Sequence, residues 1–122
     1  MINTVIIKKK QTFRYLLNKG NIYKGKNIVV YYVNSKGKNN MFGVCVSKKN
    51  GIAVHRNKMK RWAREIYKIE EPKLKKNITI VIMYKKITTI ESINYNIIKE
   101  EITKGFEEFE LYENNKKNNE HT

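Results

Sequence analysis

Two stretches of the chain, residues 28–33 and 41–47, have the patterns of β-strands. The first is a β-branched and aromatic run that is apolar on both alternating faces, as in a strand covered on both sides. The second alternates along its length, and the polar segment 34–40 between the two contains Ser, Gly and Asn, which predicts a hairpin. We therefore expect the two strands to pair antiparallel. A third strand is predicted over residues 78–84, where isoleucine occupies every second position of one face.

Two other stretches carry apolar residues at helical spacing. Residues 11–18 predict a helix that Gly20 can close in the left-handed conformation. Residues 53–69 predict a second helix, which Pro72 ends. The apolar stripe expected on this second helix consists of Met59, Trp62, Ile66 and Ile69.

A long amphipathic helix is predicted over residues 90–109, and Thr88 and Glu91 are spaced as a capping box at its start. The order helix, two or more strands, helix, strand, helix predicts an α+β sandwich in which helices pack against a small sheet. We expect one domain over residues 1–113 and a disordered polar tail over residues 114–122.

Charge is the most informative feature of the composition. The 122 residues include 26 Lys and Arg against 11 Glu, with no Asp, for a net charge of +15. Residues 1–90 hold 22 of the basic residues and only three of the Glu. A body with this charge attracts polyanions, and nucleic acid is the commonest of them. No apolar run approaches the about 20 residues that span a bilayer, and a single cysteine excludes an internal disulfide, so we expect a soluble cytoplasmic protein.

Arginine is concentrated in one segment, residues 48–64, which has seven basic residues and no acidic residue. On a helix, one face opposite the apolar stripe would carry Asn57, Lys60, Arg61, Arg64 and Lys68. Such a face presents guanidinium groups and an amide to phosphates and 2′-hydroxyls. The alternative is an ordinary solvated face, but solvated faces usually mix charges of both signs. We therefore favour contact with RNA or DNA.

Two aromatic residues are candidates for contact with unpaired bases. Phe13 lies on the first predicted helix and Tyr31 on the first predicted strand. A helix packed at the sheet edge would place both on the floor of a groove, where bases can stack on them. Core packing is the alternative for each residue taken singly.

Catalytic chemistry by the polypeptide itself has little support in the sequence. Cys45, His55 and His121 lack the spacing of zinc ligands, and residues 1–64 contain no carboxylate for a two-metal nuclease. Gly51 supplies a turn between strand and helix, but the surrounding sequence matches neither nucleotide-binding glycine pattern. We expect no catalytic and no metal-binding residue.

The string VSKKNGIAVHRNKMKRWARE over residues 46–65 resembles the signature of the protein component of bacterial ribonuclease P. That pattern is a strand ending in Ser-Lys-Lys, a glycine turn, and then Ala-Val-x-Arg-Asn-x-x-Lys-Arg-x-x-Arg on a helix. The matching positions are Lys48, Lys49, Gly51, Ala53, Val54, Arg56, Asn57, Lys60, Arg61 and Arg64. Residues 13–20 and 27–33 also resemble the family's first helix and first strand, so the resemblance covers about residues 7–112.

The resemblance implies a subunit of an endoribonuclease and not an active site. In that family an RNA subunit is the catalyst, and it removes the 5′ leader of precursor tRNA with Mg²⁺ that the RNA mainly binds. The implied contacts with the RNA subunit are Lys48, Lys49, Arg56, Asn57, Lys60, Arg61, Arg64 and Lys68. The implied leader cleft, between the first helix and the sheet, holds Phe13, Tyr31 and Leu17, where Leu17 replaces a frequent aromatic residue and offers an apolar contact only.

The family also implies a left-handed crossover of its central helix between parallel strands, against the usual rule. Its implied partners are the catalytic RNA and precursor tRNA, with no membrane and no further protein required. One competing function is a ribosomal or general RNA-binding protein, which would show no preference for a 5′ extension. A second is a self-sufficient nuclease, which would cut RNA with no RNA subunit present.

Overall fold

The computed structural model describes residues 4–7, 10–35 and 39–113. Five strands are present in this part of the chain: β1 (Thr4–Ile6), β2 (Asn21–Lys24), β3 (Ile28–Asn34), β4 (Asn40–Cys45) and β5 (Ile78–Tyr84). The α-helices are α1 (Lys10–Lys19), α2 (Ala53–Glu70) and α3 (Tyr95–Glu108). Short 3₁₀ helices are also present: η1 (Lys48–Asn50), η2 (Glu71–Lys73) and η3 (Ile90–Ser92). The predicted tail over residues 114–122 lies outside the described residues.

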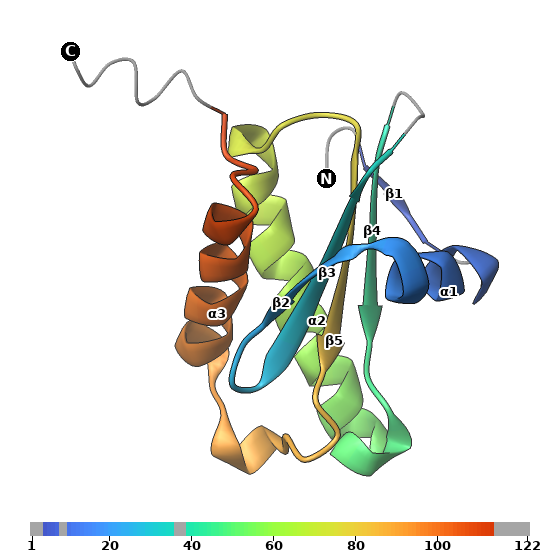
Figure 1. Cartoon of the computed structure of the whole chain (residues 1–122). Coiled ribbons are helices and arrows are strands. Elements are labelled where there is room, and N and C mark those ends of the chain that lie inside the picture. Colours follow the sequence, from blue (N-terminus) through green and yellow to red (C-terminus); the bar gives the residue numbers. More distant parts are fainter. Residues whose placement is uncertain (1–3, 8–9, 36–38, 114–122) are drawn as a thin grey trace.

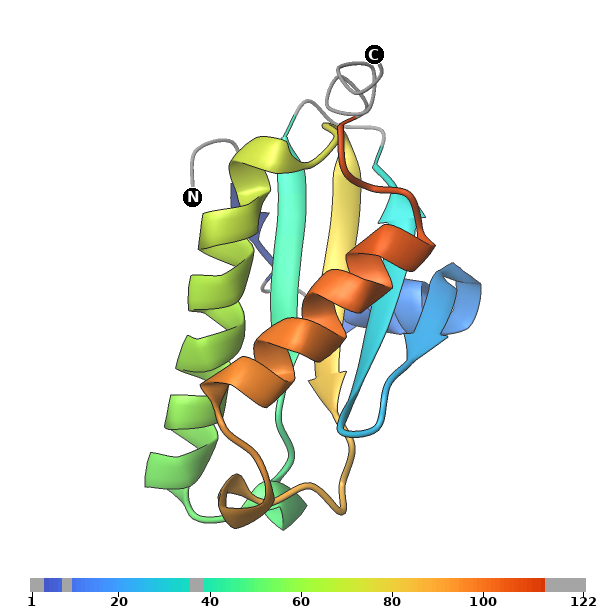
Figure 2. The same cartoon turned by 90° about the vertical axis from the view of Figure 1, so that its left-hand side faces the viewer.

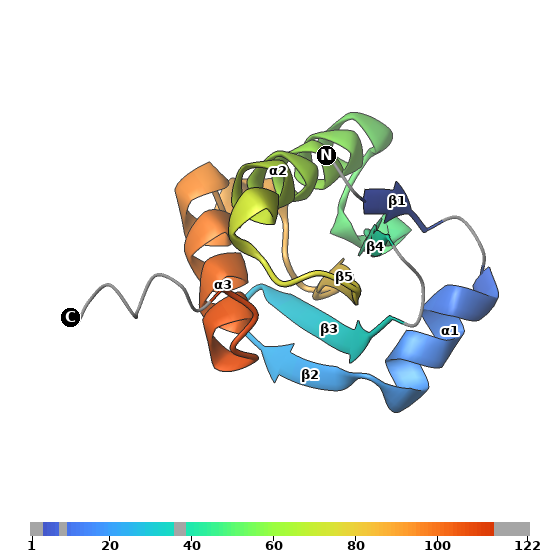
Figure 3. The ribbon, with the colours of Figure 1, turned by 90° about the horizontal axis from the view of Figure 1, so that it is seen from above.

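The five strands form one mixed sheet in the order β1-β4-β5-β3-β2. Helices α2 and α3 cover one face of the sheet and α1 covers part of the other, as Figures 1 and 3 show. The central strand β5 is buried along nearly its whole length because helices lie on both of its faces. The predicted α+β sandwich is confirmed, whereas the short strands β1 and β2 were not among the predicted elements.

The prediction that residues 28–47 form a hairpin is wrong. β3 and β4 do not pair with each other, because β5 lies between them. β3 runs antiparallel to β5 and β4 runs parallel to it, so that Val30 and Val44 both lie opposite Ile82. Alternation of apolar residues determines which face a side chain takes but not which strand becomes the neighbour. The run 28–33, which is apolar on both faces, therefore lies beside the centre as β3, and the fully covered central position is taken by β5.

Helix α2 connects the parallel neighbours β4 and β5, and this connection has an uncommon hand. In Figure 2 both strands point downward, α2 lies on the viewer's side of the sheet, and β5 lies to the right of β4. A crossover with this arrangement is left-handed, whereas nearly all such connections are right-handed. The structure therefore has the crossover that the resemblance implied.

Two apolar clusters hold the layers together. The larger cluster lies between the sheet and helices α2 and α3, and its largest buried members include Phe42, Tyr67, Ile80, Ile82 and Phe106. The smaller cluster lies under α1, where Leu16 packs against Ile7 and Val81. Neighbouring residues on β5 point to opposite faces of the sheet. The central strand consequently contributes to both clusters.

The buried stripe of α2 differs from the prediction at its end. Met59 and Ile66 are fully buried as expected, and Trp62 is half-buried against the larger cluster. Ile69, however, is 51% exposed, and its expected place is taken by the neighbouring buried residues Tyr67 and Glu70. The buried stripe shifts toward Tyr67 and Glu70 because α2 packs against both the sheet and α3. The apolar pattern of one helix does not show where a second neighbouring helix lies.

The start of α3 also differs from the prediction. The helix begins at Tyr95 and not near Ile90, and Asn94 caps it by accepting a hydrogen bond from the Ile97 amide at 2.9 Å. The capping box expected from Thr88 is absent, since the buried Thr88 hydroxyl donates to the Asn27 carbonyl at 3.1 Å. Residues before Asn94 form the separate turn η3.

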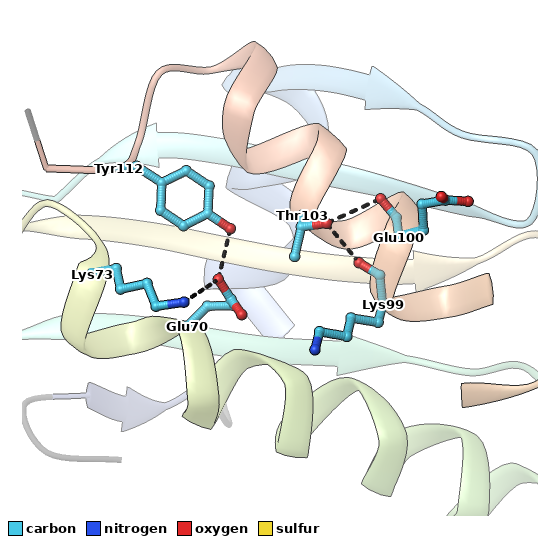
Figure 4. A network of polar contacts seen from close by, with 6 residues as sticks. All are labelled: Glu70, Lys73, Lys99, Glu100, Thr103 and Tyr112. Carbon is cyan, nitrogen blue, oxygen red and sulfur yellow. Dashed lines mark hydrogen bonds and ion pairs between the residues drawn. The ribbon is translucent and has the colours of Figure 1, made fainter. Parts of the chain in front are cut away.

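The last described residues, Tyr112 and Glu113, are bound to the end of α2 and to η2, and are called the strap (Figure 4). The Tyr112 hydroxyl donates to Oε1 of Glu70 at 2.9 Å, and Nζ of Lys73 lies 3.8 Å from the same oxygen. The Glu113 amide donates to the Lys73 carbonyl at 2.7 Å. The Glu70 carboxylate, 6% exposed as a residue, is therefore buried with partners, as a buried charge requires. In α3, beside this strap, the Thr103 hydroxyl donates to the Lys99 carbonyl at 2.9 Å.

Candidate nucleic-acid interface

A built turn leads from β4 into the arginine-rich helix. The side chains of Ser47 and Asn50 cap η1 reciprocally, with the Lys49 amide donating to the Ser47 hydroxyl at 3.0 Å and the Ser47 amide to Oδ1 of Asn50 at 2.9 Å. Gly51 follows with φ of 140°, a conformation that side chains rarely adopt. The expected glycine turn is thus present. Gly51 is the only glycine with positive φ among the described residues. Gly20 therefore does not end α1 in the left-handed conformation.

The basic face of α2 is exposed over three turns. Asn57, Arg61, Arg64 and Lys68 are exposed, and Lys60 is half-buried at the edge of the same face. The opposite side of the helix is anchored by Met59, Ala63 and Ile66 in the core. Among the described residues, none of these basic side chains forms an ion pair with a glutamate. Their charges therefore face solvent on a rigid helix, where they can meet phosphate groups.

Arg56 differs from the other arginines of the segment. It is half-buried, and its Nε donates to the Gly51 carbonyl at 3.0 Å. This bond ties the first turn of α2 to the glycine turn, so Arg56 shapes the start of the basic face. Lys48 and Lys49, on η1, are exposed beside it. All eight residues expected to contact an RNA subunit thus lie on η1 and α2.

A pocket of about 380 Å³ lies beside the basic face, where the parallel strands β4 and β5 end. Phe13 of α1, Cys45 of β4, Met83 of β5 and Lys60 of α2 line it together with Lys86. The remaining lining residues are Val44, Val46, Ser47 and Tyr84. The pocket thus combines an aromatic ring, apolar side chains and two ammonium groups, a combination suited to an unpaired nucleotide.

Phe13 takes its place in this pocket because β4 has no side chain beneath it. A Cβ on Gly43 would lie 2.8 Å from Cζ of Phe13, closer than side chains pack. The half-buried ring therefore lies directly over the backbone of β4. Tyr31 packs against the same small cluster as Phe13 but does not line the pocket, and Leu17 is 37% exposed on α1 and does not line it either. Of the three expected leader contacts, the structure brings only Phe13 into the pocket.

The environment of the Cys45 thiol in the pocket disfavours the nucleophilic thiolate form. Burial raises its pKa, and the nearby positive charge of Lys60 lowers it by less. Burial, followed by the charge of Cys45, also raises the pKa of the Tyr31 hydroxyl. Both groups are therefore neutral at physiological pH; the thiol is a weak hydrogen-bonding group, whereas the Tyr31 hydroxyl can donate and accept ordinary hydrogen bonds.

The pocket includes residues that the sequence did not suggest. Ser47, Met83 and Lys86 were not candidates, since they are far apart in the sequence from Phe13. They meet because carboxyl ends of parallel strands lie at the same end of a sheet. The signal that could have indicated them is the pair of lysines that follows β5, read together with the pair that follows β4.

No three His, Cys, Asp or Glu side chains within residues 4–7, 10–35 and 39–113 come together in a way that could hold a metal ion. In the same part of the chain, no helix combines the length and the apolar character needed to cross a membrane.

Comparisons with known proteins point in one direction. A family model described as Ribonuclease P matches residues 1–110. A protein of Dictyoglomus turgidum named Ribonuclease P protein component is 35% identical over 102 residues, which cover 83% of this chain and 85% of that protein. The solved structure of the Staphylococcus aureus RNase P protein is similar with a TM-score of 0.78 and 27% identity, and covers 88% of this chain and 97% of that one. The RNase P protein of Thermotoga maritima, 22% identical with a TM-score of 0.71, shares the fold.

Proposed function

Because this chain belongs to the ribonuclease P protein family, we propose that it binds the catalytic RNA through α2 and the 5′ leader of precursor tRNA through the pocket beside α1. Members of this family work with an RNA in maturing the 5′ end of tRNA. The chain is accordingly a subunit of an endoribonuclease, and its contribution is to bind RNA.

The observation that carries the proposal is the exposed basic face of α2. Arg61 and Arg64 are exposed on the side of the helix away from the core, and no glutamate among the described residues pairs with them. Guanidinium groups in this state lose only water when they bind phosphate, so no ion pair within the protein competes with the RNA. The fixed helix also holds them in a constant register, which favours one particular RNA surface.

The pocket supports the second half of the proposal. Phe13 offers a face for one unpaired base, and Lys60 and Lys86 can bind the flanking phosphates. Lys60 belongs to both the basic face and the pocket, so a leader in the pocket would lie next to the RNA subunit on α2. Tyr31 and Leu17 would extend this contact along α1 and β3.

We assign catalysis to the RNA subunit. The described residues offer no cluster of carboxylate, imidazole or thiol groups that fits Mg²⁺, so the protein supports no step through that ion and the RNA is proposed to bind it. The protein would act by screening the repulsion between two RNAs. We propose that this occurs in the cytoplasm, where precursor tRNA is made, and that no further protein is required.

Replacement of Arg61 or Arg64 by alanine tests the role of the basic face. Each variant should bind the RNA subunit roughly tenfold more weakly, because a charged hydrogen bond to phosphate is lost. Equilibrium binding at near-physiological salt measures the effect. Lys104→Ala, which removes an exposed lysine from α3, is the control and should bind like the wild type. Undiminished binding by both arginine variants would contradict the assignment of α2.

A further inference from the structure

One end of the molecule carries exposed apolar side chains on two segments that follow β4 and β5. The first segment is residues 48–54 and the second is residues 85–88; together they are called the basic–apolar end. Ile87 is 86% exposed, Val54 70% and Ile52 64%. They are the three most exposed large apolar residues among those described. Exposed apolar groups mark a contact surface where they gather at one place, and hydrogen bonds join the two segments that carry these three residues.

The two segments are joined by a buried cross-brace. Asn50 is 1% exposed, and its Nδ2 donates to the carbonyls of Lys85 and Thr88, both at 2.8 Å. The Thr88 amide in turn donates to the Lys85 carbonyl at 2.9 Å, which closes a tight turn with Ile87 within it. Figure 2 shows this turn against η1 at the lower end of the molecule. The exposure of Ile87 is therefore a property of a fixed turn and not of a loose loop.

Positive charge surrounds this end. Lys48, Lys49 and Lys86 are exposed and Lys85 is half-buried, and residues 46–64 and 85–90 contain no acidic residue; the exposed Glu91 on η3 is the first acidic residue that follows. A second copy of the chain placed here would bring like charges together, which opposes association. An RNA has the complementary charge, and its unpaired bases offer apolar faces. The basic face of α2 also begins at this end, with Asn57 in the second turn of the helix.

We propose that Ile87 packs against an unpaired base of the RNA subunit, so that the basic–apolar end adds an apolar contact to the phosphate contacts of α2. This inference rests on the proposed function, since it assumes that α2 faces the RNA subunit. Aliphatic side chains can insert against bases as apolar wedges. Because such a contact neutralises no phosphate, it adds affinity that salt does not screen, whereas the arginine contacts weaken as salt rises.

The test is equilibrium binding of the Ile87→Asn protein to the RNA subunit across a series of salt concentrations. We expect about tenfold weaker binding at every salt concentration, because an isoleucine side chain is no longer buried. The slope of log K against log salt should stay as in the wild type. In Arg64→Ala the magnitude of this slope should fall by about one, because one phosphate contact is lost. Ile87→Phe should bind like the wild type, since the phenylalanine ring can stack on the same base. Ile97→Asn, at a 38% exposed isoleucine on α3, is the control.

Different results separate the possible failures. If Ile87→Asn binds like the wild type while Arg64→Ala binds weakly, the role of Ile87 is overturned and the proposed function stands. If the wild type itself does not bind the RNA subunit, both fail. A loss that appears only in the binding of precursor tRNA by the assembled enzyme would contradict the assignment to the RNA subunit. A wild-type dimer in solution that Ile87→Asn dissociates would overturn it in favour of a second copy.

Discussion

Phe13 shows how a single side chain depends on a residue distant in the sequence. Its ring occupies the pocket because Gly43 leaves the backbone of β4 open beneath it. The helical pattern and the resemblance were sufficient to predict Phe13 as a candidate, but they did not indicate Gly43. The approach of a helix to a strand is a tertiary contact, and the alternation of residues 41–47 contains no information about it.

Replacement of Phe13 by alanine should weaken binding of precursor tRNA by about tenfold in the assembled enzyme, because stacking on one base is lost. Binding of mature tRNA should not change, since only the precursor carries a leader. Parallel measurements of both affinities test this prediction.

The control for Phe13 is Tyr15→Ala. Tyr15 is an aromatic residue on the same helix, 56% exposed, and two positions along a helix place it on a different side. It should leave both affinities unchanged. An equal loss for precursor and mature tRNA in Phe13→Ala would remove Phe13 from the leader contact.

Helix α2 is the element that the sequence predicted best. The spacing of Asn57, Lys60, Arg61, Arg64 and Lys68 indicated one exposed face; four of these residues are exposed there and Lys60 is half-buried. The prediction fails only for Ile69, at the end of the helix. An α-helix shows one periodicity, whereas the buried stripe of α2 depends on two neighbours, the sheet and α3. The angle of α3 is not present in the pattern of α2.

The contact between the strap and helix α2 also gives a testable prediction. Tyr112→Phe should lower the free energy of unfolding by about 2 kcal/mol, because the Glu70 carboxylate loses a hydrogen bond while buried. Denaturant unfolding measures this, with Tyr15→Phe as the exposed control. Equal stability of the two variants would mean that the hydrogen bond from Tyr112 to Glu70 contributes nothing to the fold.

The same hydroxyl predicts a dependence on pH. Burial, followed by the Glu70 carboxylate, raises the pKa of Tyr112 above its ordinary value of 10.0. Below pH 10.0 the hydroxyl is protonated in both the folded and the unfolded chain, so its contribution to stability is complete. As the pH rises further, the unfolded chain loses this proton first and the contribution is lost. Tyr112→Phe should therefore show a smaller loss of stability than the wild type at high pH.

At the scale of the whole molecule, the topology was the part least accessible from the sequence. The interposition of β5 between β3 and β4 brings Phe13, Lys60 and Lys86 to one pocket, although they come from three separate segments. Residue patterns predicted the strands but paired the wrong ones. The hand of the crossover came from the resemblance alone, because periodicity carries no information on chirality.

The distribution of charge fits this topology. The basic residues of η1, α2 and the turn after β5 lie around one end and one side of the molecule, whereas residues 91–122 carry eight of the 11 Glu. This separation of charge supports the proposal that the basic end and side of the molecule attract RNA. Its proposed contribution is to bring RNAs together and not to cut them.

Cleavage of a 5′-extended precursor tRNA at low Mg²⁺ tests this proposal most directly, with the protein alone, a bacterial ribonuclease P RNA alone, and the two together. We expect activity mainly in the mixture, with the cut at the mature 5′ end. Tight RNA binding without stimulation of cleavage would contradict the role as a ribozyme subunit. Cleavage by the protein alone would contradict the assignment of catalysis to the RNA.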